Sequence, residues 1–101
     1  MGQTVNGKYV GVEKFIFADV YNFLTRNLNT SGSDIEWNRI ATEARALGEK
    51  YDNSPLAIDM IVSAYTQIEY ACGQISSDSK RFTKPYKVWE SELLTKLNSC
   101  R

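Results

Sequence analysis

Apolar residues recur at steps of three and four along most of this 101-residue chain, the spacing that places them on one face of an α-helix. The pattern predicts four helices, at about 12–29, 34–50, 55–76 and 84–99. No segment alternates strongly enough between apolar and polar residues to compete as a strand. The prediction is therefore an all-α protein, a compact four-helix bundle with up-down connectivity and short loops.

Two local signals mark where the middle helices begin. The stretch SDIE, Ser33–Glu36, has the form of a capping box, in which Ser33 accepts from the backbone N–H of Glu36 and the Glu36 carboxylate reaches back to the N–H of Ser33. Ser54 followed by Pro55 predicts an N-cap with proline at the first helical position, where its missing N–H costs nothing.

The third predicted helix carries apolar residues on so wide an arc that we expect it to be central, touching neighbours on several sides. The same arc allows either a well-covered monomer or a homodimer with a helical interface. Gly73 should weaken the last turns of this helix by about 1 kcal/mol relative to alanine.

The first eleven residues, MGQTVNGKYVG, hold three glycines and predict a flexible arm ahead of a single helical domain at 12–101. The opening MGQTV resembles the start of gammaretroviral matrix proteins and nearly matches the N-myristoylation signature. Asn6 stands where that signature requires Ser or Thr. The first 33 residues carry three positive and two negative charges, which is no basic patch to support an acyl chain. A myristoylated, matrix-like membrane protein is therefore a remote alternative.

The composition offers little for catalysis. Twelve basic and twelve acidic residues cancel, and the absence of histidine removes the commonest general base, the base of Ser-His and Cys-His pairs, and the usual imidazole ligands of zinc. No phosphate-binding, dinucleotide or calcium-loop motif is present. Apolar runs of three or four residues are too short for a membrane span of about 20. We expect no enzyme activity, no cofactor, no metal and a cytoplasmic location.

The two cysteines, Cys72 and Cys100, are expected to lie far apart if the last two helices run antiparallel. A disulfide needs Cα atoms within about 7 Å. We therefore expect a core thiol at Cys72 and an unbridged thiol at Cys100, consistent with a reducing compartment.

Charge is divided unequally along the chain. From residue 80 onward there are six positive and two negative side chains, whereas residues 34–79 carry three positive and eight negative ones. The stretch KRFTKPYK interleaves cations with aromatic residues, which suits neutralisation of phosphates and stacking of bases. A partner-protein contact and an ordinary solvated turn are the alternatives. The candidate nucleic-acid or partner-binding residues are Lys80, Arg81, Lys84, Tyr86 and Lys87.

Glu36, Glu43 and Asp52 form a candidate acidic surface for a partner. Glu36 and Glu43 are seven residues apart and share a helix face, with Arg39 between them. A metal or acid–base pair is one alternative. A solvated face held by Glu–Arg pairs at helical spacing is the other, and it is favoured because di-metal bundles use Glu-x-x-His motifs and this chain has no histidine.

Two stretches, FADVYNFLTRNLN and IEWNRIATEARALGEKYDNSPLAIDMIVSAYTQIEYACG, resemble small uncharacterised helical proteins encoded by Firmicutes and their phages. The likeness covers residues 17–73 and implies a mobile-element accessory protein that blocks a bacterial host or defence factor, as anti-CRISPR proteins do. The leading hypothesis is thus a non-enzymatic protein that acts by protein–protein interaction. Nucleic-acid binding through the basic 80–87 turn is the alternative.

Overall fold

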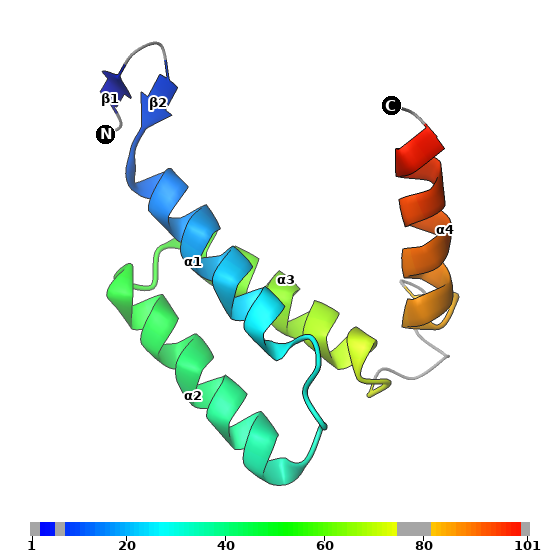
Figure 1. Cartoon of the computed structure of the whole chain (residues 1–101). Helices are drawn as coiled ribbons and strands as arrows, with labels where there is room; N and C mark the ends of the chain where they lie inside the picture. Colours follow the sequence, from blue (N-terminus) through cyan, green and yellow to red (C-terminus); the bar gives the residue numbers. More distant parts are fainter. Residues whose placement is uncertain (1–2, 6–7, 75–81, 100–101) are drawn as a thin grey trace.

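The computed structural model describes residues 3–5, 8–74 and 82–99, and its helices confirm that the protein is all-α in class. The helices are α1 (Val12–Asn27), α2 (Asp34–Lys50), α3 (Pro55–Ala71) and α4 (Tyr86–Ser99). A short antiparallel pair, β1 (Gln3–Val5) and β2 (Lys8–Val10), precedes α1 (Figure 1).

The β1–β2 pair is an element that the sequence analysis did not predict. Gln3 pairs with Val10 and Val5 with Lys8. Strands of three residues are too short to show an alternating pattern of apolar and polar residues, so the sequence predicts only a flexible arm here.

Helices α1, α2 and α3 form the packed body of the protein, and successive helices run in opposite directions (Figure 1). Helix α3 contacts both others and packs most extensively on α1, as its wide apolar arc predicts. Phe23, Ile40 and Ile68, one from each helix, are fully buried. The remaining buried core residues are Ile16, Val20, Ala57, Ile61 and Ala64.

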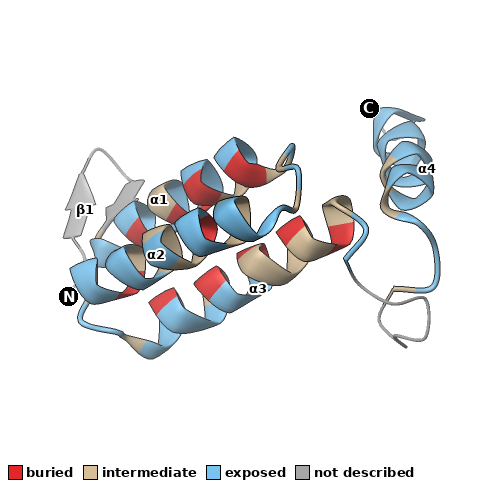
Figure 2. Ribbon diagram, turned by 90° about the horizontal axis from the view of Figure 1, so that it is seen from below, coloured by how far each residue is buried: buried red, intermediate tan, exposed pale blue. Residues whose placement is uncertain are grey.

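The arrangement differs from the expected compact four-helix bundle because α4 stands apart from the three-helix body (Figures 1 and 2). Its main contacts are with the C-terminal end of α3, and none of its described residues is buried. The aromatic residues just before and at the start of α4 gather around Tyr70 of α3.

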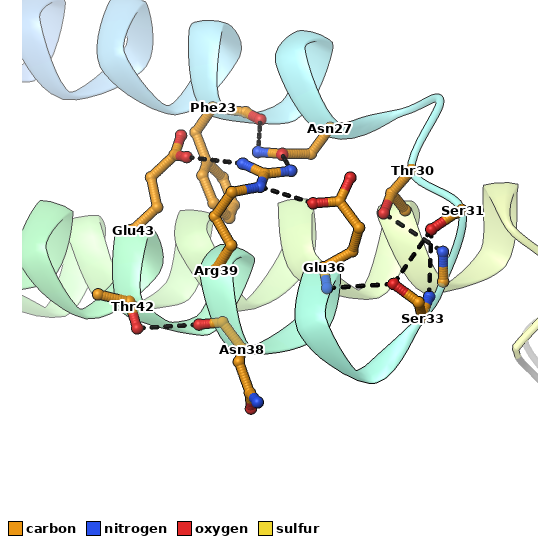
Figure 3. A network of polar contacts seen from close by, with 11 residues as sticks. Phe23, Asn27, Thr30, Ser31, Ser33, Glu36, Asn38, Arg39, Thr42 and Glu43 are labelled. Atoms are coloured by element: carbon orange, nitrogen blue, oxygen red, sulfur yellow. Dashed lines mark hydrogen bonds and ion pairs between the residues drawn. The ribbon is translucent and has the colours of Figure 1, made fainter.

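The first turn of α2 carries half of the predicted capping box. Ser33 Oγ accepts from the N–H of Glu36 at 3.3 Å (Figure 3). The Glu36 carboxylate accepts from Arg39 at 2.8 Å, and the N–H of Ser33 donates to Ser31 Oγ at 3.3 Å. Because the Glu36 carboxylate binds the Arg39 guanidinium, it does not cap the N–H of Ser33. Helix α2 still spans the predicted range of 34–50.

Helix α3 begins with Pro55 at its first position, as predicted, but ends at Ala71 instead of near residue 76. Gly73 adopts a φ of 80°, and Gln74 N–H donates to the Glu69 carbonyl at 2.9 Å while Gly73 N–H donates to the Tyr70 carbonyl at 3.2 Å. This is a Schellman motif, in which a left-handed glycine closes the helix. Gly73 therefore terminates α3 instead of weakening a longer helix.

The turn between α2 and α3 depends on a close approach at Gly48. Asp52 and Asn53 both adopt left-handed φ values, 54° and 52°, and Asn53 N–H donates to the Gly48 carbonyl at 2.9 Å. A Cβ on the buried Gly48 would lie 3.0 Å from Asn53 Oδ1 and 3.3 Å from Ile58 Cδ1. Glycine thus lets the end of α2 and the start of α3 pack together.

Candidate interaction surfaces

An aromatic cluster joins the end of α3 to the start of α4, and Tyr70 is its centre. Tyr70 is 7% exposed, and its ring centroid lies 4.2 Å from that of Phe82, 5.4 Å from that of Tyr86 and 5.9 Å from that of Trp89. Its hydroxyl donates to the Lys84 carbonyl at 2.7 Å. Edge-on and tilted ring pairs stabilise such clusters beyond their buried area. The cluster therefore fixes where α4 begins.

Tyr86 is held inside this cluster by a second hydrogen bond. Its hydroxyl donates to Glu90 at 2.7 Å, and its ring lies 5.7 Å from that of Trp89. Burial, followed by the bond to Glu90, raises the pKa of the Tyr86 phenol to about 12. Both effects favour the neutral phenol. Burial penalises the charge of the phenolate, and the nearby Glu90 carboxylate accepts the phenol proton and repels a second negative charge.

The structure brings three of the predicted basic-turn residues to the start of α4. Lys84 pairs with Glu92, and Lys87 Nζ lies 5.9 Å from the centroid of the Tyr86 ring. Lys80 and Arg81 lie outside the described residues. The rings expected to stack on bases pack against Tyr70 instead, and contact with nucleic acid stays a prediction.

A row of partly exposed apolar side chains continues along α4 from the aromatic cluster towards the C-terminal end of the helix. Trp89, Leu93 and Leu97 follow one another at four-residue steps and so share a face, with Leu94 beside them. They are 37, 37, 55 and 52% exposed, respectively.

A second exposed apolar surface lies between α1 and α3. Phe17, Tyr21 and Leu24 of α1 face Met60 of α3 across a groove of about 510 Å³. Phe17 and Tyr21 are 57 and 65% exposed. The remaining lining residues are Val20 and Ala64 from the core, with Asp59, Ser63 and Gln67. Asp59 is the one charged residue among those that line the groove.

Two residues of the predicted acidic surface, Glu36 and Glu43, form ion pairs with Arg39 within α2 (Figure 3), and Glu43 also pairs with α1. Arg39 donates to Glu36 at 2.8 Å and to Glu43 at 3.5 Å, and Arg26 of α1 also pairs with Glu43. The hydrogen bond from Arg39 lowers the pKa of the Glu36 carboxyl. Asp52 lies apart from both, in the exposed turn after α2.

The centre of this α1–α2 contact is Asn27, which sequence reasoning missed. Asn27 is 1% exposed; its Nδ2 donates to the Phe23 carbonyl at 2.8 Å, and its Oδ1 accepts from Arg39 Nη2 at 2.9 Å (Figure 3). A buried amide with both of its polar atoms bonded stabilises the helix pair instead of destabilising it. Its four-residue step from Phe23 on the buried stripe is the signal that could have revealed it.

A second tie between the same helices lies at the other end of α2. Lys50 donates to Asp19 at 2.7 Å, and the Tyr51 hydroxyl donates to the same carboxylate. These bonds, from Lys50 first and Tyr51 second, lower the pKa of the Asp19 carboxyl. Tyr51 is therefore placed by its hydroxyl, which the apolar pattern did not reveal.

Neither metal chemistry nor a membrane span is visible in the described residues. Across 3–5, 8–74 and 82–99, no group of three or more His, Cys, Asp or Glu could hold a metal ion. Within the same ranges, no helix has the length and apolar character needed to cross a bilayer. The half-buried Cys72 thiol lies 3.5 Å from the Glu69 carbonyl oxygen, and Cys100 falls outside these ranges.

Comparison with known proteins adds no identity. No family model, curated protein or solved structure matches this chain. The resemblance over residues 17–73 to small helical proteins of Firmicutes and their phages stays a prediction.

Proposed function

We propose that the protein is a non-enzymatic binding module that acts by protein–protein interaction, with α4 as the element that it presents. The observation that carries the proposal is the exposure of α4: fourteen residues, none of them buried, with Trp89, Leu93 and Leu97 in one row. Contiguous exposed apolar surface of this kind marks an interaction site more often than chance.

The physical argument is that α4 gains little from remaining unpartnered. An isolated helix shorter than about 12–15 residues is marginal in water, and most helical stability in proteins comes from packing an amphipathic face. The aromatic cluster secures only the first turn of α4, up to Trp89. A partner groove that covers Leu93 and Leu97 would stabilise the rest, in the helix-in-groove mode of recognition.

For the class of partner, we propose a bacterial host or defence factor that is blocked by occupation of its surface. The support for this part is the resemblance of residues 17–73 to small uncharacterised helical proteins encoded by Firmicutes and their phages, which implies an accessory protein of a mobile element.

The test is affinity capture from a Firmicutes lysate with three forms of the chain. The wild type is compared with the double variant Leu93→Glu/Leu97→Glu and with Val88→Glu. Val88 is a matched control because it is 44% exposed and lies on the opposite side of α4 from the row. The proposal predicts a protein retained by wild type and Val88→Glu and lost by the double variant. Equal retention by all three forms, or by none, contradicts it.

A further inference from the structure

The groove between α1 and α3 and the apolar row of α4 are two unpartnered surfaces on the same chain. From these surfaces we infer that α4 of a second copy of this chain occupies the groove, and that two chains exchange α4 reciprocally. The inference rests on the proposed function, since it names one partner for the surface that α4 presents.

The part of the α4 row beyond the aromatic cluster fits within the groove. From Leu93 to Leu97, α4 rises by about 6 Å, and α3 rises by about 12 Å from Asp59 to Gln67 along the groove. The groove is lined by large exposed side chains on one helix, Phe17 and Tyr21, and by smaller ones on the other, Ser63 and Ala64. A row of leucines seated between them would exclude water from both surfaces.

Charge at the rim gives the seated helix a direction. Asp59 lies near the N-terminal end of α3 and forms no salt bridge within the described ranges 3–5, 8–74 and 82–99. Lys96 lies in the last turn of α4, next to Leu97. An α4 that runs antiparallel to α3 brings Lys96 to Asp59 and Leu93 to Ser63, and Trp89 stays in the aromatic cluster of its own chain.

The aromatic cluster favours a second copy over the chain's own α4. The start of α4 is fixed at the end of α3 by the Tyr70 ring contacts and by the bond from the Tyr70 hydroxyl to Lys84. To reach its own groove, α4 would swing about its first turn, and Tyr86 and Trp89 would lose their contacts with Tyr70. A helix from a second chain fills the groove while both clusters stay intact.

The size of the interface requires the exchange to be reciprocal. Specific interfaces engage about 20–30 residues a side. Nine residues line the groove, and α4 has fourteen. If each chain gives both its groove and one face of its α4, which is about half of its fourteen residues, roughly 16 residues a side take part and the interface approaches this range. One α4 in one groove engages only about half as many. A twofold, self-complementary arrangement of this kind is the commonest form of homodimer.

The experiment measures molar mass by light scattering after size exclusion, with chain concentrations from about 5 to about 500 µM, where weak interfaces of this size associate. A groove variant, Phe17→Glu/Tyr21→Glu, is compared with the helix variant Leu93→Glu/Leu97→Glu. The controls are Phe15→Glu, on another side of α1, and Val88→Glu. All of the substituted side chains are exposed, and circular dichroism establishes that each variant is folded.

The wild type and both controls are expected to shift from monomer to dimer mass as concentration rises, whereas the groove and helix variants stay monomeric. An equimolar mixture of these two variants retains only one intact contact, wild-type helix in wild-type groove, and should dimerise far more weakly than the wild type because the exchange needs both. Either variant alone, or the mixture, dimerising as the wild type does overturns the inference. So does a wild type that is monomeric throughout the range.

A charge exchange tests the orientation independently of the leucines. Asp59→Lys and Lys96→Asp should each weaken dimerisation by several-fold, and the two together should restore it, because the pair is re-formed with opposite signs. Additive loss in the double variant contradicts the antiparallel seat. If α4-dependent capture of a bacterial protein persists while the chain is always monomeric, the proposed function stands and this inference fails. If the chain dimerises through α4 but captures no bacterial protein, this inference stands and the proposed bacterial partner fails.

Discussion

Replacement of Tyr70 by alanine should release α4 from the body without unfolding the body. Tyr70 contacts the rings of Phe82, Tyr86 and Trp89, and it lies outside the buried cluster that joins α1, α2 and α3. Loss of a large buried aromatic side chain costs about 3–5 kcal/mol. Here that cost falls on the docking of α4.

The expected size of the effect follows from the helix lengths. Helix α4 has fourteen residues, against sixteen in α1 and seventeen each in α2 and α3. A released helix of this length is marginal, so Tyr70→Ala should lose roughly a fifth of the helical circular dichroism signal. The thermal midpoint of the remaining signal should stay close to that of the wild type.

Two further variants isolate the cause. Tyr70→Phe removes only the hydroxyl bond to Lys84, worth about 1 kcal/mol, and should keep the helical signal because the ring contacts remain. Phe15→Ala removes an exposed ring from α1 and should leave α4 in place. The measurements are made at the lowest practical concentration, where self-association is negligible. Full retention of the signal in Tyr70→Ala, or collapse of the whole melting transition, would refute the reasoning.

Three other predictions concern the body. Asn27→Ala should lower the free energy of unfolding by about 1–3 kcal/mol, because Arg39 loses a buried acceptor, whereas the exposed control Asn22→Ala should change it by less than about 0.5 kcal/mol in urea titrations. Ile68→Ala should cost about 2–5 kcal/mol, and Ile35→Ala, at a site 82% exposed, should cost little; equal costs would contradict the assigned core. Because the pKa of Asp19 is lowered from its ordinary value of 3.8, its stabilising contribution is complete above that value and is lost as pH falls through the lower folded-state pKa. The wild type should therefore lose stability on acidification more steeply than Asp19→Asn, as measured by urea midpoints at about pH 6 and about pH 3, and parallel losses would rule out this role.

The elements that the sequence predicts well are those defined by neighbouring residues. Helix α2 starts after Ser33 and ends at Lys50, as its apolar spacing and capping serine indicate. The end of α3 was also encoded locally, since a glycine just after the last apolar positions is typical of a helix C-terminus. The predicted helix runs past this point because the apolar Ile75, two residues beyond Gly73, continues the helical spacing of apolar residues.

The parts that could not be predicted depend on contacts between distant segments. The spacing of Trp89, Leu93 and Leu97 establishes that α4 has an apolar face, but it holds no information about which surface that face meets. Asn27 is buried only because Arg39, twelve residues away on another helix, satisfies its carbonyl. The pairing of Glu36 and Glu43 with arginines was among the stated alternatives, and the structure contains those pairs.

Small-angle X-ray scattering of the monomer tests most directly the claim that α4 stands away from the three-helix body. The structure has a Cα radius of gyration of 15.9 Å, whereas a compact domain of this length has about 13 Å. The measurement is made on the monomer peak eluting from a size-exclusion column. A value near 16 Å is predicted. A value near 13 Å would mean that α4 closes onto its own body as the fourth helix of a bundle, and would contradict the account.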